Sequence, residues 1–144
     1  MYSHILVAVE HSAADATILA HAQALAKLVG SRMTLVHVAD GWVARNYDGL
    51  ALRESDEMKD DRAYLDRLVD EIQSNGIPVD CTLAKGDPAT EILRVANETG
   101  VDLIAMATHG HRFLADMLKG ATADRVRHLA RVPVLMLRHQ PPPA

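Results

Sequence analysis

Five short, predominantly apolar runs constrain the fold of this chain more than any other feature. They cover residues 5–9, 33–38, 77–83, 101–106 and 132–137. A strand with one exposed face alternates apolar and polar residues, whereas a strand of a parallel sheet is covered on both faces and is mostly apolar. The runs therefore predict five buried strands of a parallel sheet.

Helix signals occupy the segments between the runs. Ser12 with Asp15 three residues later resembles a capping box, and Gly30 suits the end of that helix. Asp87 followed by Pro88 predicts an N-cap and the first helical residue of a later helix. The predicted helices are residues 12–29, 58–72, 88–99 and 123–131.

Alternating strands and helices predict an α/β fold. Repeated βαβ units with right-handed crossovers give a three-layer sandwich, and we expect one five-stranded parallel sheet of order 3-2-1-4-5. A single domain is expected over residues 1–138, followed by a disordered tail, residues 139–144. Ligands of such sheets bind beyond the carboxyl ends of the strands, where the strand order reverses.

Composition narrows the classes of function. The net charge is −4, which argues against general affinity for nucleic acid, and no apolar stretch approaches the ~20 residues that span a bilayer. The one cysteine, Cys81, and the lack of signal-peptide features near the first residue favour a cytoplasmic protein. Residues 107–144 nevertheless hold six basic and only two acidic residues, which favours anion capture there.

A glycine-containing segment joins the fourth predicted strand to the last predicted helix. It runs from Met106 to Thr122 and contains Gly110 and Gly120. Bare backbone amides before a helix, together with the positive end of the helix dipole, make a binding site for phosphate. The chain has no P-loop motif, and the turn from Glu10 to Asp15 lacks the glycines of the dinucleotide-binding fingerprint.

The glycine segment and four other pieces resemble the universal stress proteins over residues 5–138. Nucleotide-binding members carry Gly-x-x-Gly, nine residues and Gly-Ser/Thr, where this chain has Ala107-Thr-His-Gly110, nine residues and Gly120-Ala121. The other similar pieces are residues 5–12, 35–38, 86–92 and 132–135.

The resemblance implies a Rossmann-like fold of the adenine nucleotide alpha hydrolase type, with ATP, and magnesium as its counter-ion, across the strand ends. It implies contacts of Ala8, Val9 and Glu10 with adenosine and of the Val38 backbone with adenine. The remaining implied contacts, on the nucleoside and phosphate side, are Met106, Ala107, His109, Gly110, His111, Gly120, Ala121 and Thr122. The last three would form a phosphate cradle at the start of the final helix.

Three residues depart from the family pattern. Ala107 replaces the first glycine, and Glu10 stands where the family usually has aspartate, so its carboxylate extends one methylene further. Ala121 lacks the hydroxyl that would donate to a phosphate, a loss of roughly 0.5–3 kcal/mol, although Thr122 is adjacent.

Other polar groups have competing interpretations. His109 and His111 could chelate a metal with Glu10 or His11, but we expect no protein-ligated metal. His37, within an apolar run, is interpreted as a satisfied core residue, and Arg125 as the basic residue nearest a phosphate. Five acids at the start of the second helix are interpreted as a solvated group that stabilises the helix dipole: Glu54, Asp56, Glu57, Asp60 and Asp61.

Three functions remain open from the sequence. The first is a regulatory protein that binds ATP or a related adenine nucleotide and an unknown protein partner. The second is an interaction module that has lost nucleotide binding. The third is a slow ATPase using Glu10, His109 and Arg112. A homodimer through the apolar fifth strand is expected, as is a loop, residues 39–53 with Trp42, that covers the pocket or meets the partner subunit.

Overall fold

The computed structural model describes residues 1–39, 56–108 and 116–140, with the backbone alone for residues 116–120. The strands are β1 (His4–Ala8), β2 (Arg32–Ala39), β3 (Val79–Lys85), β4 (Leu103–Thr108) and β5 (Val134–Arg138). The helices are α1 (Ala14–Val29), α4 (Asp56–Ser74), α5 (Pro88–Thr99) and α6 (Asp116–Leu129).

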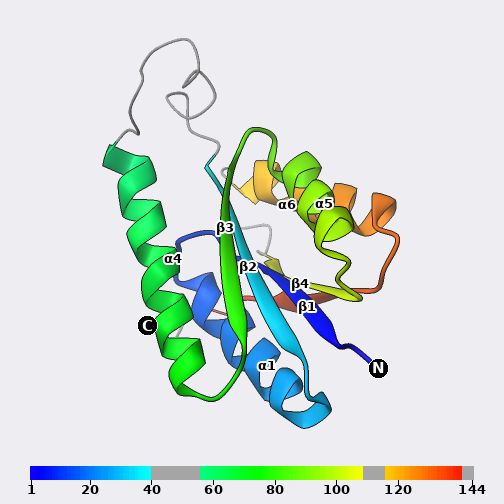
Figure 1. The fold of residues 1–144 in the computed structure, drawn as a ribbon. Coiled ribbons are helices and arrows are strands. Elements are labelled where there is room, and N and C mark those ends of the chain that lie inside the picture. The colour runs from blue at the N-terminus through cyan, green and yellow to red at the C-terminus, as the bar shows by residue number, and fades with distance from the viewer. Residues whose placement is uncertain (40–55, 109–115, 141–144) are drawn as a thin grey trace.

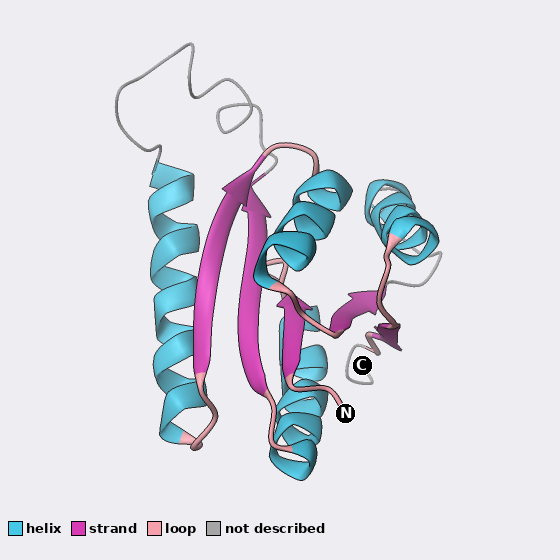
Figure 2. Cartoon of the chain, turned by 45° about the vertical axis from the view of Figure 1, so that its right-hand side comes forward, coloured by secondary structure: helices cyan, strands magenta, loops and turns pink. Residues whose placement is uncertain are grey.

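These elements form a three-layer α/β sandwich. All strand pairs in the sheet are parallel and the order is β3-β2-β1-β4-β5, as the apolar runs predicted. Helices α1 and α4 cover one face of the sheet, and α5 and α6 cover the other (Figures 1 and 2). Every residue of β1 is buried, as expected for a central strand of such a sheet.

Two hydrophobic clusters fill the spaces between the layers. Successive strand residues point to opposite faces, so Ile5 and Val7 pack with α1 and α4 while Leu6 and Ala8 pack with α5 and α6. Val126 of α6 is fully buried in the second cluster. Because all five strands are parallel, their carboxyl ends lie at one edge of this two-sided core, where the candidate site lies.

The helix ends largely follow the sequence signals. The side chain of Asp87 accepts a hydrogen bond from the Thr90 N–H at 3.0 Å, with Pro88 at the first helical position, and Gly30 ends α1 with φ of 78°. The capping box at the start of α1 is only partly formed. Asp15 does accept from the Ser12 N–H, but α1 is capped by Ala13 without a side-chain hydrogen bond.

The predicted start of the last helix is wrong. Helix α6 begins at Asp116, seven residues before Ala123, so Gly120 lies inside it. The segment from Met117 to Lys119 consists of strong helix formers, which offset the cost of about 1 kcal/mol for one interior glycine. In this conformation residues 120–122 follow the first turn of the helix. Their N–H groups therefore donate to the carbonyls four residues earlier in α6. A phosphate cradle of free amides at these positions is therefore not formed.

Two expectations concern residues at or beyond the limits of the described chain. Most of the loop of residues 39–53, including Trp42, lies outside the described residues, as do residues 141–144 of the predicted tail. His139, the first residue of that tail, donates its N–H to the Thr108 carbonyl at 2.9 Å, which continues the β4–β5 ladder. Within the described ranges, no helix has the length and apolarity that crossing a membrane requires.

A polar chain crosses the strands near their amino ends, with His4 and Thr34 buried and Asp80 exposed. Thr34 Oγ1 donates to Asp80 Oδ1 at 2.5 Å and lies 2.7 Å from His4 Nε2, so Nε2 must carry the hydrogen that Thr34 accepts. The other ring nitrogen, His4 Nδ1, is buried with no hydrogen-bond partner among the described residues. Burial, followed by the charge of Arg32, lowers the pKa of His4 below its ordinary value of 6.5.

His4 should make the protein less stable in mild acid. Since the native pKa is lowered, the unfolded chain takes up a proton at His4 before the native protein does. The free energy of unfolding should therefore fall as the pH drops through 6.5 and level off below the native pKa. Chemical denaturation between pH 5 and 8 should show this slope reduced in His4→Gln, by up to about one proton. His128→Gln, at an exposed position of α6, is the control, and an unchanged slope in His4→Gln would contradict the assignment.

Candidate functional site

A cavity of about 450 Å³ lies at the carboxyl ends of the strands, between the sheet and the helices α5 and α6. Strand β1 has β2 on one side and β4 on the other, so the chain leaves the sheet in opposite directions at this point. Such a switch point is where parallel sheets bind ligands. We call this the larger cavity.

The larger cavity brings together most of the residues predicted for the nucleotide. Its lining includes Ala8, Val9, Glu10, Val38, Met106, Ala107, Ala121 and Thr122. Gly120 lies in α6 next to Ala121. The other predicted residues, His109, Gly110 and His111, lie outside the described part of the chain.

Sequence reasoning missed several residues that complete the lining. They are Val36, His37, Gly86, Asp87, Pro88 and Ile92, and Arg125, which the sequence placed nearest a phosphate, also lines the cavity. The Asp87-Pro88 signal was recognised as a helix start, but its position directly after β3 also places it at the ligand-binding edge of the sheet. Gly86 has φ of 129°, a conformation that glycine alone adopts without strain, which permits the close turn from β3 to α5.

An ion pair bridges α5 and α6 at the larger cavity. Arg125 Nη1 donates to Asp87 Oδ2 at 2.8 Å, and Arg125 Nη2 lies 3.4 Å from Thr90 Oγ1. Asp87 also accepts from the Thr90 hydroxyl at 2.6 Å and from the Thr90 N–H. These hydrogen bonds from Thr90, with the Arg125 guanidinium, hold the pKa of Asp87 below its usual range. Both charged side chains are about half exposed, so the pair can exchange partners.

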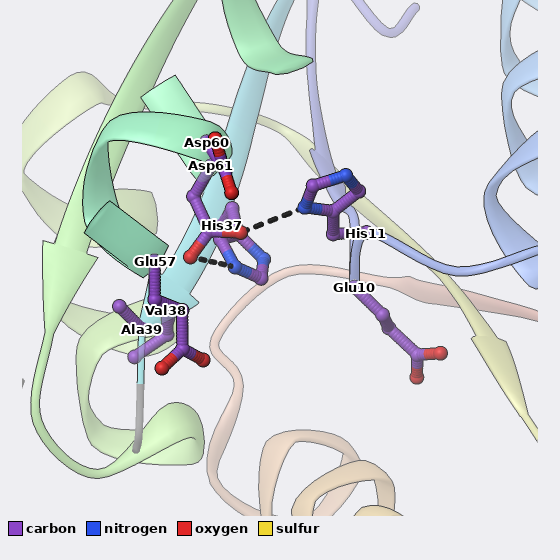
Figure 3. Close-up of a pocket in the computed structure, with 8 residues that line it drawn as sticks. All are labelled: Glu10, His11, His37, Val38, Ala39, Glu57, Asp60 and Asp61. Carbon is purple, nitrogen blue, oxygen red and sulfur yellow. Dashed lines mark hydrogen bonds and ion pairs between the residues drawn. The ribbon is translucent and has the colours of Figure 1, made fainter. Parts of the chain in front are cut away.

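A smaller cavity of about 290 Å³ borders three residues of the larger one, Glu10, His37 and Val38. Its remaining lining is His11, Ala39, Glu57, Asp60 and Asp61. Figure 3 shows both histidines directed at Asp61, while the Glu10 side chain extends away from them. The smaller cavity is therefore rich in carboxylates.

Asp61 joins two histidines from different elements. Its Oδ1 lies 2.7 Å from His11 Nδ1 and its Oδ2 lies 3.2 Å from His37 Nε2. His37 Nδ1 donates to the Val9 carbonyl at 2.9 Å, so a proton must lie between His37 Nε2 and Asp61, since two lone pairs would otherwise face each other. His11 likewise donates from Nδ1 to the Asp61 carboxylate, because a carboxylate oxygen can only accept.

His11 is held in an unusual backbone conformation. Its φ is 62°, which is uncommon for a residue with a side chain, and its N–H donates to Asp15 Oδ2 at 2.8 Å. The imidazole stacks on Tyr64 of α4 with ring centroids 4.0 Å apart. Tyr64 donates its hydroxyl to Asp15 at 2.6 Å, and burial together with this bond raises the Tyr64 pKa. The turn after β1 is thus fixed from both α1 and α4.

The interpretation of Asp61 as a solvated acid at a helix start is wrong. Asp61 is buried against His11 and His37, whereas Asp56, Glu57 and Asp60 are exposed as predicted, and Glu54 lies outside the described residues. His37 is the satisfied residue that its apolar run indicated, but it also lines both cavities. Within the described ranges, no group of three His, Cys, Asp or Glu residues is arranged to hold a metal ion.

The two cavities differ in charge. Carboxylates of Glu10, Glu57, Asp60 and Asp61 line the smaller cavity, whereas Arg125 contributes to the larger one. Among the described residues that line either cavity, Arg125 is the one lysine or arginine. An anionic group is therefore favoured at the α5–α6 end and disfavoured at the smaller cavity.

Comparisons of sequence and of structure identify the same family over nearly the full length of the chain. The sequence model described as the universal stress protein family matches residues 1–138. The chain is 29% identical to universal stress protein YxiE of Bacillus subtilis over 148 residues, covering 96% of this chain and 100% of that one. The solved structure of MJ0577, a universal stress protein of Methanocaldococcus jannaschii, is 25% identical, with a TM-score of 0.83 and 99% of each chain covered.

Two further structures with the same fold contain an adenine nucleotide. One is the universal stress protein from Archaeoglobus fulgidus in complex with dAMP, with a TM-score of 0.68, 24% identity and coverage of 94% of this chain and 97% of that one. The other is a universal stress protein in complex with cAMP, with a TM-score of 0.70, 16% identity and coverage of 94% and 96%. With the family match over nearly the full length, the chain belongs to the universal stress protein family.

Proposed function

We propose that the protein binds ATP or a related adenine nucleotide in the larger cavity and acts as a regulatory protein whose surface depends on nucleotide state. The observation that carries the proposal is the larger cavity itself. It lies at the switch point of the sheet and is lined by residues that the glycine-segment resemblance selected independently of the structure. The dAMP and cAMP complexes of proteins with this fold support adenine as the base.

The lining suggests a role for each part of the cavity. The Val38 backbone at the end of β2 is proposed to contact adenine, and the Glu10 carboxylate is proposed to accept from ribose hydroxyls. Ala8 and Ala107 leave room for the nucleoside over the strand ends, because neither side chain extends beyond a methyl group. The family pattern has the hydroxyl of Ser or Thr at the position of Ala121. In this chain the adjacent Thr122 of α6 provides a hydroxyl instead.

Magnesium would enter with the phosphates of ATP. The described residues contain no group of three metal-ligating side chains, so the phosphate oxygens rather than the protein would supply most ligands. The proposal is one of nucleotide binding, and catalysis of phosphoryl transfer would in addition need a metal clamp and a positioned base.

Assembly and location belong to the same proposal. The edge strand β5 is half-buried at Val134 to Leu137 and, in the described part of the chain, pairs with β4 alone, which supports a homodimer through this strand. Sedimentation velocity at micromolar concentration tests it, and a pure monomer would contradict it. The single cysteine, Cys81, supports a cytoplasmic protein, because oxidising compartments favour paired cysteines.

Isothermal titration calorimetry with ATP, ADP, AMP, adenosine and GTP tests the nucleotide proposal. We expect the adenine compounds to bind and GTP to bind at least about tenfold more weakly, a difference of ~1.4 kcal/mol. The absence of binding by every adenine compound at millimolar concentration would contradict the proposal and favour an interaction module without a nucleotide.

A further inference from the structure

The charged groups around the larger cavity indicate which protein residue meets the phosphates of the ligand. On the β1–β2 side, Glu10 lines both cavities, and the smaller cavity adds the exposed carboxylates of Glu57 and Asp60. On the α5–α6 side, Asp87 is matched by Arg125. A polyphosphate chain avoids the first side because its charge has the same sign as those carboxylates.

Arg125 is positioned to change partners. Its guanidinium is about half exposed at the cavity and is paired with Asp87 through one nitrogen, with the second nitrogen near Thr90. An arginine fork can bind phosphate through two parallel hydrogen bonds, which is a better match than its present single bond to Asp87. Asp87 would not be left unsatisfied, because the Thr90 N–H and hydroxyl both continue to donate to it.

We propose that Arg125 binds the phosphates of the nucleotide and leaves Asp87 to do so, so that nucleotide binding opens the ion pair between α5 and α6. This inference rests on the proposed function and adds a specific residue, a phosphate-dependent affinity and a structural change. The change is confined to the contacts of Arg125 with Asp87 and Thr90, which join two helices that pack against each other.

The two partners should respond in opposite directions when each is neutralised. Arg125→Gln should weaken ATP about tenfold, the scale of one charge-assisted hydrogen bond, while adenosine affinity stays within twofold. Asp87→Asn should tighten ATP about threefold, because asparagine no longer competes for the guanidinium. Asparagine is also as good an N-cap as aspartate, so α5 should remain intact in this variant.

Three further variants separate phosphate binding from a structural role. Arg125→Lys should restore part of the ATP affinity, and the double variant Asp87→Asn/Arg125→Gln should behave like Arg125→Gln alone. Arg127→Gln is the matched control, because Arg127 lies on the same helix, pairs with Asp124 at 3.3 Å and does not line the larger cavity. We expect it to leave both affinities unchanged.

Calorimetry with ATP and adenosine at fixed salt, with thermal unfolding of each variant, decides between the outcomes. If the parent binds both ligands and Arg125→Gln leaves ATP unchanged, the inference is wrong and the proposed function stands. If Arg125→Gln weakens ATP and adenosine equally, Arg125 only supports the fold of the cavity and the inference is again wrong. If the parent binds neither ligand, the proposed function and the inference fail together.

Discussion

Asp15→Ala is expected to lower the free energy of unfolding by about 3–5 kcal/mol. Asp15 is 1% exposed, and its carboxylate accepts four hydrogen bonds, from the amides of Glu10, His11 and Ser12 and from the Tyr64 hydroxyl. Hydrogen bonds to charged groups contribute roughly 1.5–3 kcal/mol each, but the turn amides regain some water contact once the carboxylate is gone. The expected loss of stability is therefore well below four times the contribution of one such hydrogen bond.

Graded variants make this prediction specific. Asp15→Asn retains one acceptor oxygen and should lose less stability than Asp15→Ala, and Tyr64→Phe removes a single donor and should lose about 1 kcal/mol. Asp70→Ala, at an exposed position of α4, should stay within about 0.5 kcal/mol of the parent. Urea titration measures all four, and an Asp15→Ala protein as stable as Asp70→Ala would show that the turn after β1 does not depend on this carboxylate.

Ala121→Phe is expected to abolish nucleotide binding while leaving the fold intact. Ala121 is exposed on α6, yet it lines the larger cavity, so an aromatic ring at this position enters the space proposed for the ligand. Affinity for ATP and for adenosine should both fall at least about a hundredfold, which corresponds to ~2.7 kcal/mol. The loss of adenosine binding distinguishes this variant from Arg125→Gln, which should affect only the phosphates.

A second aromatic variant on the same helix provides the control. His128 is exposed on α6 and does not line the larger cavity, so His128→Phe adds a comparable ring without filling the site. Calorimetry should show normal affinity for this protein, and thermal unfolding should show both variants folded. Unchanged ATP affinity in a folded Ala121→Phe protein would place the ligand outside the larger cavity.

The fold could be predicted because each strand of a parallel sheet carries its signal locally. Residues 5–9 are apolar because both faces of β1 are covered, and that pattern needs no knowledge of the neighbouring strands. The helix limits were less predictable. The glycine at position 120 suggested a helix start, but the helix propensity of residues 116–119 prevailed and α6 begins earlier.

The candidate site could be predicted only for residues that belong to a recognisable local sequence motif, and not for residues whose role depends on a partner far away in the sequence. The family resemblance selected Ala8, Val38 and Met106, and they line one cavity because strand ends meet at one edge of a parallel sheet. The role of Asp61 was missed because its partner His11 is 50 residues earlier, and no local pattern distinguishes a buried acid from a solvated one at a helix start. Arg125 was recognised as near a phosphate, but its pairing with Asp87 depends on how α5 and α6 pack.

The turn after β1 also has a consequence for motion. Three successive amides, those of Glu10, His11 and Ser12, donate to the same carboxylate of Asp15, so none of them can open alone without disturbing the others. Their hydrogens should therefore exchange with solvent at similar rates, as one cooperative unit rather than as three independent sites. A ligand that contacts Glu10 would then slow the hydrogen exchange of all three amides together. The exchange rates of this turn would thus report whether the site is occupied, without an added probe.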